Sequence, residues 1–254
     1  MDDTPGETAL PGGNVGGAVR VGDTVRRPTG PWTPAVHGLL DFLAGAGLRG
    51  VPRVRGFDEQ GREILDFIPG RTFDTANERV PDEVLAAGMR WLREYHRAVA
   101  SYRPAGVVRW RTSQAELGPD EIVCMHDYGA YNWVVDGNEL VGVIDWDMAG
   151  PGTPLDDIAF TAWNTAPLAH PEPPSYAAHR LRLMAAAYDG GITALQILYR
   201  APARARRSAR VIGAGQQAGD PGMLNLAKVG EPGNSLRRAA DLEQRTPAIA
   251  ALLD

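Results

Sequence analysis

Cysteine is nearly absent from this sequence of 254 residues, in which Cys124 is the single example. One cysteine excludes a disulfide framework and any zinc site built from several cysteines. A basic excess is also lacking, since the formal net charge is -5, and this argues against a nucleic-acid partner. No run approaches the roughly 18 consecutive apolar residues of a membrane span, and residues 1–10 lack the pattern of a signal peptide. We therefore expect a cytoplasmic protein with no membrane partner, and its oligomeric state stays open.

Strand-like segments dominate the first third of the chain. The pair 18–21 and 24–26 flanks Gly-Asp, which predicts a hairpin, and residues 36–44 have the apolar spacing of a helix. The glycine-rich segment 11–17 matches neither Gly-x-Gly-x-x-Gly nor a Walker loop, so it is either a phosphate-covering loop or an unstructured lead-in. Further strands are predicted at 51–56 and 63–68.

The remaining chain is predicted to be mostly helical. It begins with a long amphipathic helix over 81–102, and Pro202 is expected to break or kink a later helix. The change in pattern predicts an α+β protein with two unequal lobes, namely residues 1–68 and residues 69–254. Short strands are expected at 121–124, 132–135 and 140–144, and helices at 180–188, 192–200, 203–213 and 241–253.

One segment in the middle of the chain carries polar groups suited to phosphoryl transfer. Asp127 and Asn132 are separated by four residues in a loop between predicted strands, and Asp145 ends the next hairpin. Phosphoryl transfer needs a carboxylate to take the proton of the acceptor hydroxyl, together with hard oxygen ligands for magnesium. The three residue types match these needs.

The order of these residues resembles the aminoglycoside phosphotransferases, a phosphotransferase enzyme family with a kinase-like fold. The family pattern Asp-x-x-x-x-Asn is followed by Ile-Asp-Trp-acid, Gly-x-Pro and Asp-Leu-Ala, and residues 144–159 of this chain follow it closely. The resemblance covers most of the chain and implies a small β-rich N-terminal lobe with one main helix and a larger, mostly helical C-terminal lobe. It also implies an ATP- and Mg²⁺-dependent kinase, with GTP as an alternative donor, that acts on a hydroxyl of a small molecule.

The resemblance also assigns roles to individual residues. Asp127 is the expected catalytic base, and Asp157 is expected either to brace the catalytic loop or to cap the following helix. The expected metal ligands are Asn132, Asp145 and, as an additional or more distant carboxylate, Asp147. The expected nucleotide-binding residues are Arg26 and the backbone of Asp66, Phe67 and Ile68.

Three positions depart from the family pattern. Met125 replaces the usual histidine two residues before the catalytic aspartate, and His126 is shifted next to it. Arg26 replaces the usual phosphate-binding lysine, with Arg27 expected on the opposite face, and the two cations are not equivalent. His37 stands where the small-lobe helix normally offers a glutamate to that cation.

These departures keep other hypotheses open. A non-catalytic nucleotide-binding pseudokinase or scaffold is the first alternative, and a metal-dependent hydrolase that uses Asp127, Asp145 and Asp147 is the second. The acceptor also stays open: an aminoglycoside is typical of the family, and clustered acids around the cleft would favour such a polyamine. An arginine-rich stretch is expected to be a solvated helix face or, alternatively, a phosphate or acidic-partner site, and it comprises Arg200, Arg204, Arg206, Arg207 and Arg210.

Overall fold

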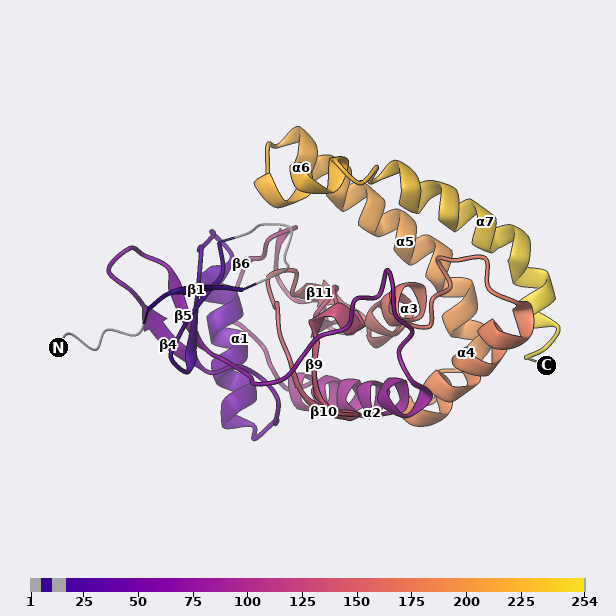
Figure 1. Cartoon of the computed structure of the whole chain (residues 1–254), viewed down its shortest axis with the longest axis horizontal. Coiled ribbons are helices and arrows are strands. Elements are labelled where there is room, and N and C mark those ends of the chain that lie inside the picture. The colour runs from indigo at the N-terminus through magenta and orange to yellow at the C-terminus, as the bar shows by residue number, and fades with distance from the viewer. Residues whose placement is uncertain (1–5, 11–16, 254) are drawn as a thin grey trace.

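The computed structural model of the chain describes residues 6–10 and 17–253 (Figure 1). Of the glycine-rich segment 11–17, only Gly17 is among them, so the question of a phosphate-covering loop lies outside the described residues.

An antiparallel sheet and one helix form the smaller lobe (Figure 1). The described strands follow the order β1-β2-β3-β5-β4, and each neighbouring pair is antiparallel. The predicted hairpin is confirmed, because β2 and β3 pair across a turn in which Gly22 adopts a φ of 59°. The helix α1 (Thr33–Gly45) lies beside the sheet and buries Leu39 and Leu40 as its spacing predicted. The strands are β1 (Thr8–Ala9), β2 (Val19–Val21), β3 (Thr24–Arg27), β4 (Val54–Phe57) and β5 (Glu63–Asp66).

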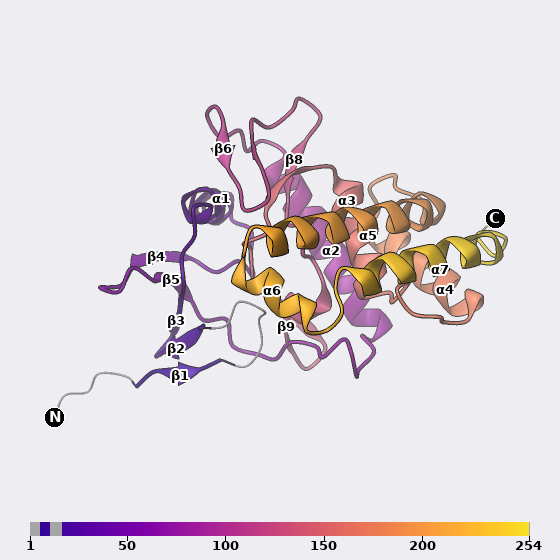
Figure 2. The same cartoon turned by 90° about the horizontal axis from the view of Figure 1, so that it is seen from above.

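The larger lobe is mostly helical and extends away from the sheet (Figures 1 and 2). Its first helix, α2 (Asp82–Val99), has acidic residues in the first turn and basic ones in the last, which suits the helix dipole. The apolar face of α2 packs against α4, and β9 and β10 form the predicted hairpin. The other elements are β6 (Val108–Arg109), β7 (Gln114–Ala115), β8 (Ile122–Cys124), η1 (Ala130–Asn132), β9 (Trp133–Asp136), β10 (Glu139–Val143), β11 (Gly150–Gly152), α3 (Pro154–Asn164), α4 (Pro174–Tyr188), α6 (Pro221–Ala227) and α7 (Gly233–Ala250).

One long helix, α5 (Ala194–Gln217), continues through Pro202, so the predicted separation into two helices is wrong. Proline removes one backbone N–H and the hydrogen bond that it would donate four residues back, which is a local loss. Pro202 is buried, and α5 packs along α3 and α7 (Figures 1 and 2). Burial of the whole helix outweighs the single missing bond.

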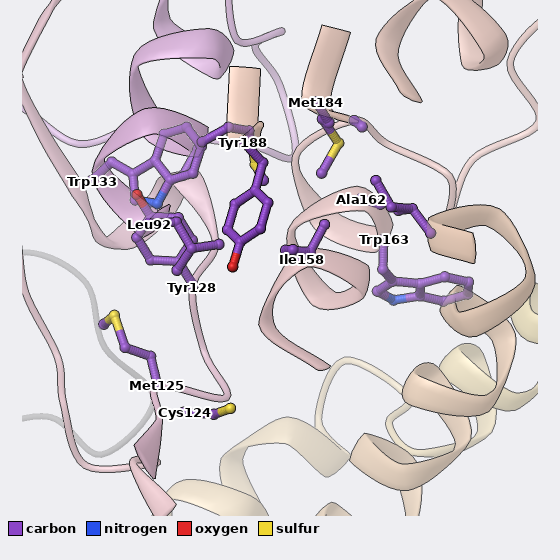
Figure 3. Packing of buried hydrophobic residues seen from close by; sticks show 14 of the residues in the cluster. Leu92, Cys124, Met125, Tyr128, Trp133, Ile158, Ala162, Trp163, Met184 and Tyr188 are labelled. Atoms are coloured by element: carbon purple, nitrogen blue, oxygen red, sulfur yellow. The ribbon is translucent and has the colours of Figure 1, made fainter. Parts of the chain in front are cut away.

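Trp133, at the start of β9, is fully buried in the core of the larger lobe beside Leu92 and Tyr128 (Figure 3). Its ring lies directly against Gly88 of α2, where an added Cβ would come within 2.4 Å of it. Tyr128 is fully buried beside Trp133 and donates a hydrogen bond of 2.8 Å to the carbonyl of Gly88. These contacts anchor the loop 125–132 on α2, so the candidate catalytic residues stand on a rigid base.

No helix in the described parts of the chain combines the length and the apolar character needed to cross a lipid bilayer.

Candidate active site

A cavity of about 850 Å³ lies where the sheet meets the helical lobe. Val25, Leu65 and residues 66–68 line it from the sheet side, and residues of α3, α5 and α6 line it from the opposite side. Asp127, Asn132 and Asp145 all line the same cavity. The structure therefore brings together the three polar residues that the sequence motif singled out.

The loop 125–132 is held in place by Asp157 of α3. The carboxylate of Asp157 is fully buried and accepts hydrogen bonds from the backbone N–H groups of Met125 (3.0 Å) and His126 (2.8 Å). His96 of α2 contacts the same carboxylate at 3.1 Å. Burial alone would raise the pKa of Asp157, but these contacts outweigh it and lower that pKa overall. Of its two expected roles Asp157 thus has the bracing one, while the neighbouring Asp156 forms the capping box of α3.

His126 takes part in the loop geometry that the brace stabilises. Its backbone has a φ of 59°, a conformation that residues other than glycine rarely adopt. Its Nε2 lies 3.0 Å from the carbonyl of Pro151, and its carbonyl accepts a hydrogen bond of 2.6 Å from Arg204. Met125, at the usual histidine position, is fully buried in the core. The shift of the histidine by one place therefore leaves the loop braced.

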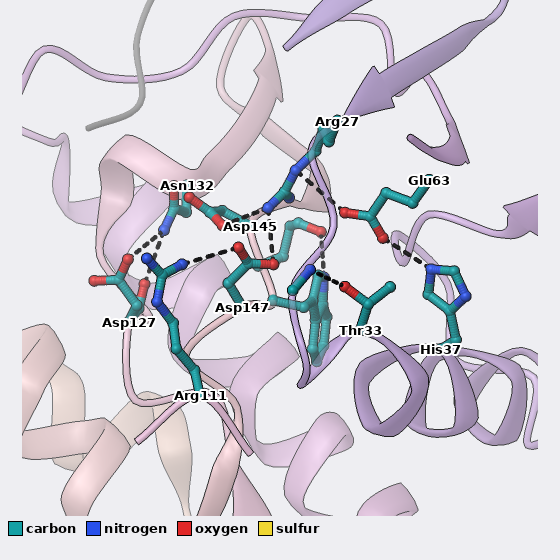
Figure 4. A network of polar contacts seen from close by, with 12 residues as sticks. Arg27, Thr33, His37, Glu63, Arg111, Asp127, Asn132, Asp145 and Asp147 are labelled. Carbon is teal, nitrogen blue, oxygen red and sulfur yellow. Dashed lines mark hydrogen bonds and ion pairs between the residues drawn. The ribbon is translucent and has the colours of Figure 1, made fainter. Parts of the chain in front are cut away.

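Asp127 lies partly buried at the cavity wall with both carboxylate oxygens fixed (Figure 4). The hydroxyl of Tyr131 donates to Oδ1 at 2.5 Å, and the amide of Asn132 donates to Oδ2 at 3.2 Å. Loss of water around the carboxylate, followed by the nearby charge of Asp145, raises its pKa to about 7. At neutral pH the group is therefore poised to accept or release a proton.

Asn132 and Asp145 are brought together by the backbone. The N–H of Ile144 donates to the carbonyl of Asn132 at 2.9 Å, so the residue before Asp145 is hydrogen-bonded to Asn132 itself. The Asn132 amide nitrogen faces Asp127, which turns its oxygen away from that carboxylate. Within residues 6–10 and 17–253, no group of three His, Cys, Asp or Glu side chains is arranged around a common metal position. One carboxylate and one amide oxygen nevertheless suit Mg²⁺, which takes few protein ligands and completes its shell with water and phosphate oxygens.

Arg27, and not Arg26, faces the site, which corrects the choice between the two arginines (Figure 4). Arg27 contacts Asp145 at 3.3 Å, Asp147 at 2.8 Å and Glu63 at 3.4 Å. Arg26 instead hydrogen-bonds the Thr24 side chain, at the opposite face of the same strand. Successive residues of a strand alternate between faces, and the sequence alone does not say which face meets the cavity.

Glu63 supplies the carboxylate that the small-lobe helix does not. It is the direct cross-strand partner of Arg27 in the β3–β5 pair and is only 3% exposed. The Nε2 of His37 lies 2.8 Å from the second oxygen of Glu63 (Figure 4). His37, at the usual glutamate position of the helix, thus contacts Glu63, and Glu63 in turn contacts Arg27.

Asp147 is engaged by two guanidinium groups, which speaks against its expected role as a metal ligand. Arg27 contacts Oδ1 at 2.8 Å and Arg111 contacts Oδ2 at 3.1 Å. Arg111 also pairs with Asp220, the residue that caps α6, at 3.0 Å, and lies over the ring of Trp32. The sequence motif does not predict this pair, because Arg111 and Asp220 lie outside it and are 109 positions apart.

The segment 66–68 lines the sheet side of the cavity, where adenine is expected. Its backbone is fixed from both ends: the N–H of Asp66 donates to the carbonyl of Arg53 at 3.0 Å, and that of Phe67 donates to Asp23 at 2.9 Å. The carboxylate of Asp66 is paired with Arg55 at 2.6 Å. These two N–H groups are therefore paired within the fold, and the apolar residues Phe67 and Ile68 line the cavity.

Comparison with known proteins adds an independent observation. The model of the phosphotransferase enzyme family matches residues 89–191, which include the loop 125–132, Asp145 and Asp157. Residues 89–191 are therefore similar to the phosphotransferase enzyme family. This confirms the resemblance that the motif indicated.

Individual proteins that are similar to this chain extend the comparison. A trifolitoxin immunity protein from Rhizobium leguminosarum bv. trifolii is 37% identical over 169 residues, which cover 64% of this chain and 63% of that protein. The match thus spans less than two thirds of the length of this relative. A choline/ethanolamine kinase family protein from Mesorhizobium loti superimposes with a TM-score of 0.63 at 16% identity, covering 100% of this chain and 92% of that one.

A second solved structure is the amicoumacin kinase in complex with AMP-PNP, Ca²⁺ and amicoumacin. It superimposes with a TM-score of 0.59 at 11% identity, covering 98% of this chain and 89% of that one. At such identities the likeness shows the fold alone, and the predicted kinase-like α+β fold with two unequal lobes is confirmed.

Proposed function

We propose that this chain is an ATP- and Mg²⁺-dependent phosphotransferase that moves the γ-phosphate of the nucleotide to a hydroxyl group of a small molecule. The observation that carries the proposal is the meeting of Asp127, Asn132 and Asp145 in one cavity, within a segment that is similar to the phosphotransferase enzyme family. In the proposal residues 1–68 bind the nucleotide and residues 69–254 bind the acceptor, in the cytoplasm.

Asp127 takes the proton of the acceptor hydroxyl. A pKa of about 7 leaves a large ionised fraction at neutral pH and gives the carboxylate a useful affinity for a proton. Tyr131 and Asn132 each hold one carboxylate oxygen, so the base is positioned as well as tuned.

Asn132 and Asp145 hold Mg²⁺. The side chain of Asp145 is 41% exposed, and its contact with Arg27 is long at 3.3 Å, so its oxygens are accessible from the cavity. When bound, the metal neutralises charge on the phosphates of the nucleotide. In this proposal Asp147 anchors Arg27 and Arg111 and does not contact the metal.

Arg27 binds phosphate oxygens, and the backbone of 66–68 contacts the base. Glu63 and His37 fix the guanidinium on the cavity side of β3, which preserves the usual pairing of a phosphate-binding cation with a glutamate. Arg26, the residue first expected here, is not part of the proposed site.

The pseudokinase alternative loses much of its motivation. It was based on Arg26, His37 and Met125, whereas the structure offers Arg27 with Glu63 as partner and a catalytic loop braced by Asp157. The hydrolase alternative needs Asp147 as a metal ligand, and both oxygens of that residue are paired with arginines.

Nucleotide binding tests the proposal without knowledge of the acceptor. Thermal unfolding is measured with ATP or GTP, each with Mg²⁺ or with EDTA, and ADP or GDP formation is followed in parallel. We expect nucleotide to raise the unfolding temperature in a Mg²⁺-dependent way. Asp145→Asn is expected to remove this stabilisation. Asp136→Asn, at an exposed residue at the end of β9, is the control and is expected to leave it unchanged. Absence of any nucleotide effect in the unmodified chain contradicts the proposal.

The trifolitoxin immunity relative suggests a biological role in protection from a toxin. We expect a trifolitoxin-sensitive strain that expresses the chain to grow at higher toxin concentrations than a strain that expresses Asp127→Asn. Equal protection by both would show that any immunity function does not depend on phosphoryl transfer.

A further inference from the structure

The two walls of the cavity differ in charge. The lining outside α3 to α7 carries four aspartates together with three arginines, namely Asp66, Asp127, Asp145, Asp147, Arg27, Arg71 and Arg111. Among the described lining residues from α3 to α7, Glu231 is the one carboxylate, and it accepts a hydrogen bond of 3.1 Å from the backbone N–H of Ser235. The helical wall therefore lacks the cluster of acids that a polycationic acceptor needs.

The same wall carries two arginines on one face of α5. Arg204 and Arg207 are three residues apart and both line the cavity, as does Ser208. Arg204 is 4% exposed, donates to the carbonyl of His126 at 2.6 Å, and has no carboxylate within ion-pair distance among the residues that the structure describes. Its charge interacts beyond ion-pair distance with Asp157, Asp156 and Asp127, so its main role in this wall is to hold the carbonyl of His126.

Arg207 is the arginine available to a ligand. Its contact with Asp156 is long, at 3.8 Å, and Asp156 is already bound by Arg200 at 2.6 Å and by Thr153. Arg207 lines the cavity, and its side chain is 39% exposed. A guanidinium placed in this way binds carboxylates well, because it donates two parallel hydrogen bonds.

The rest of this wall is largely apolar. Phe160 and Trp163 of α3 are almost fully buried and line the cavity. Val211 and Ile212 continue the α5 surface beyond Arg207, and α6 contributes the side of the cavity nearest the end of α5 (Figures 1 and 2). This surface suits an acceptor with an apolar body.

We propose that the acceptor is a hydroxyl compound with an apolar body and a carboxylate that Arg207 binds, and that it is not a polycationic amino sugar. The inference rests on the proposed function, since it names the substrate class of that same site. It departs from the aminoglycoside acceptor that the family resemblance first suggested.

Three matched probes test it by calorimetry without nucleotide, so the result is independent of catalysis. The probes are N-octanoyl-L-serine, which has a hydroxyl, an apolar chain and a carboxylate, its neutral methyl ester, and the cationic octylamide of serine. Gentamicin serves as the polycation. We expect N-octanoyl-L-serine to bind at least about tenfold more tightly than each of the others, because it alone can form a charge-assisted pair with Arg207.

Reversing the charge at Arg207 tests whether this residue binds the carboxylate of the probe. Arg207→Glu is expected to weaken N-octanoyl-L-serine by tenfold or more and to strengthen the octylamide. Arg210→Glu makes the same charge change on the same helix at an exposed residue that does not line the cavity, and is expected to leave the ranking unchanged. Thermal unfolding of both variants checks that they fold.

Two kinds of result would overturn the proposal. The proposal is overturned if the carboxylate probe binds no better than the ester, the octylamide or gentamicin, which includes no detectable binding of any probe at millimolar concentration. It is also overturned if Arg207→Glu changes only the affinity for ADP. If the probe ranking holds but no nucleotide binds, the carboxylate site stands and the proposed phosphotransferase function fails.

Discussion

Asp127 lies in the loop 125–132 and Asp157 braces that loop, yet their pKa values are shifted in opposite directions. Both are shielded from water, which by itself raises the pKa of each. Asp157 accepts two backbone N–H bonds and contacts His96, and these contacts lower its pKa overall. Asp127 has Tyr131 and Asn132 as donors but also feels the charge of Asp145, and its pKa rises to about 7.

The comparison shows that the charge partners of a carboxylate, and not burial alone, separate a structural aspartate from a reactive one. Asp157 is stabilised as an anion and holds the backbone of the loop. Asp127 is destabilised as an anion and is therefore ready to take a proton. Each prediction below tests one side of this contrast.

The largest expected effect is on catalysis at Asp127. Asp127→Asn keeps the shape of the side chain but removes the base. Turnover of ATP with a hydroxyl acceptor is therefore expected to fall by about 10²–10⁴-fold. The free energy of unfolding at pH 8 is expected to be unchanged or higher, because a poorly solvated charge is removed. Steady-state ADP formation and urea unfolding measure the two quantities, and a stability loss that accompanies the lost turnover would contradict the contrast.

Asp157→Asn is expected to act mainly on stability. An amide at this position places an N–H₂ group near donors that need an acceptor, and the free energy of unfolding is expected to fall by about 3 kcal/mol. Urea unfolding measures the loss. Asp136→Asn makes the same chemical change at an exposed residue, so it is the matched control and is expected to change the free energy of unfolding by less than about 0.5 kcal/mol. Equal losses in the two variants would show that Asp157 is not a special brace.

The two adjacent arginines of β3 provide a smaller and sharper test. Arg27→Gln is expected to weaken ATP binding in Mg²⁺ by about tenfold, because one charge-assisted contact to phosphate is lost. Arg26→Gln, on the opposite face of the strand, is expected to change the affinity less than twofold. Calorimetric titration with ATP distinguishes the two, and the reverse ranking would restore Arg26 as the phosphate-binding residue.

The same contrast also predicts how the free energy of unfolding depends on pH. Between about pH 4 and pH 7 folded Asp127 keeps its proton while the unfolded group has lost it, so this residue makes stability fall as pH rises. Its contribution is at most about 1.4 kcal/mol per pH unit. Asp157 acts in the opposite sense, and its contribution is lost as pH falls below the unfolded value of 3.8. Urea unfolding from pH 4 to pH 8 should show a flatter profile in Asp127→Asn than in the unmodified chain.

The sequence predicted most of the fold because its signals are local. Turn residues at Gly22-Asp23 and the apolar spacing of α1 and α2 each depend on a few neighbouring residues. Pro202 was misjudged for the same reason: the packing of α5 on α3 and α7 that overrides the proline comes from distant parts of the chain.

In the candidate site, too, local features were predictable from the sequence and contacts between distant residues were not. Asp127, Asn132 and Asp145 lie within one short motif and were found from it. The partners of Arg27 were not found from the sequence. Alternation along β3 predicts that Arg26 and Arg27 face opposite sides, but it does not predict which side meets the cavity. The pairing of Arg27 with Glu63 follows from the β3–β5 register, which no local pattern specifies.

The most direct test of the account is the titration of the Asp127 carboxyl group itself. Carbon-13 labelling of aspartate and NMR spectra from pH 3 to pH 9 follow each side chain, and the signal missing from Asp127→Asn identifies this one. The account predicts that this signal titrates near pH 7, well above an ordinary aspartate. Titration of the same signal below about pH 5 would contradict the claim that Asp127 is a base poised at neutral pH.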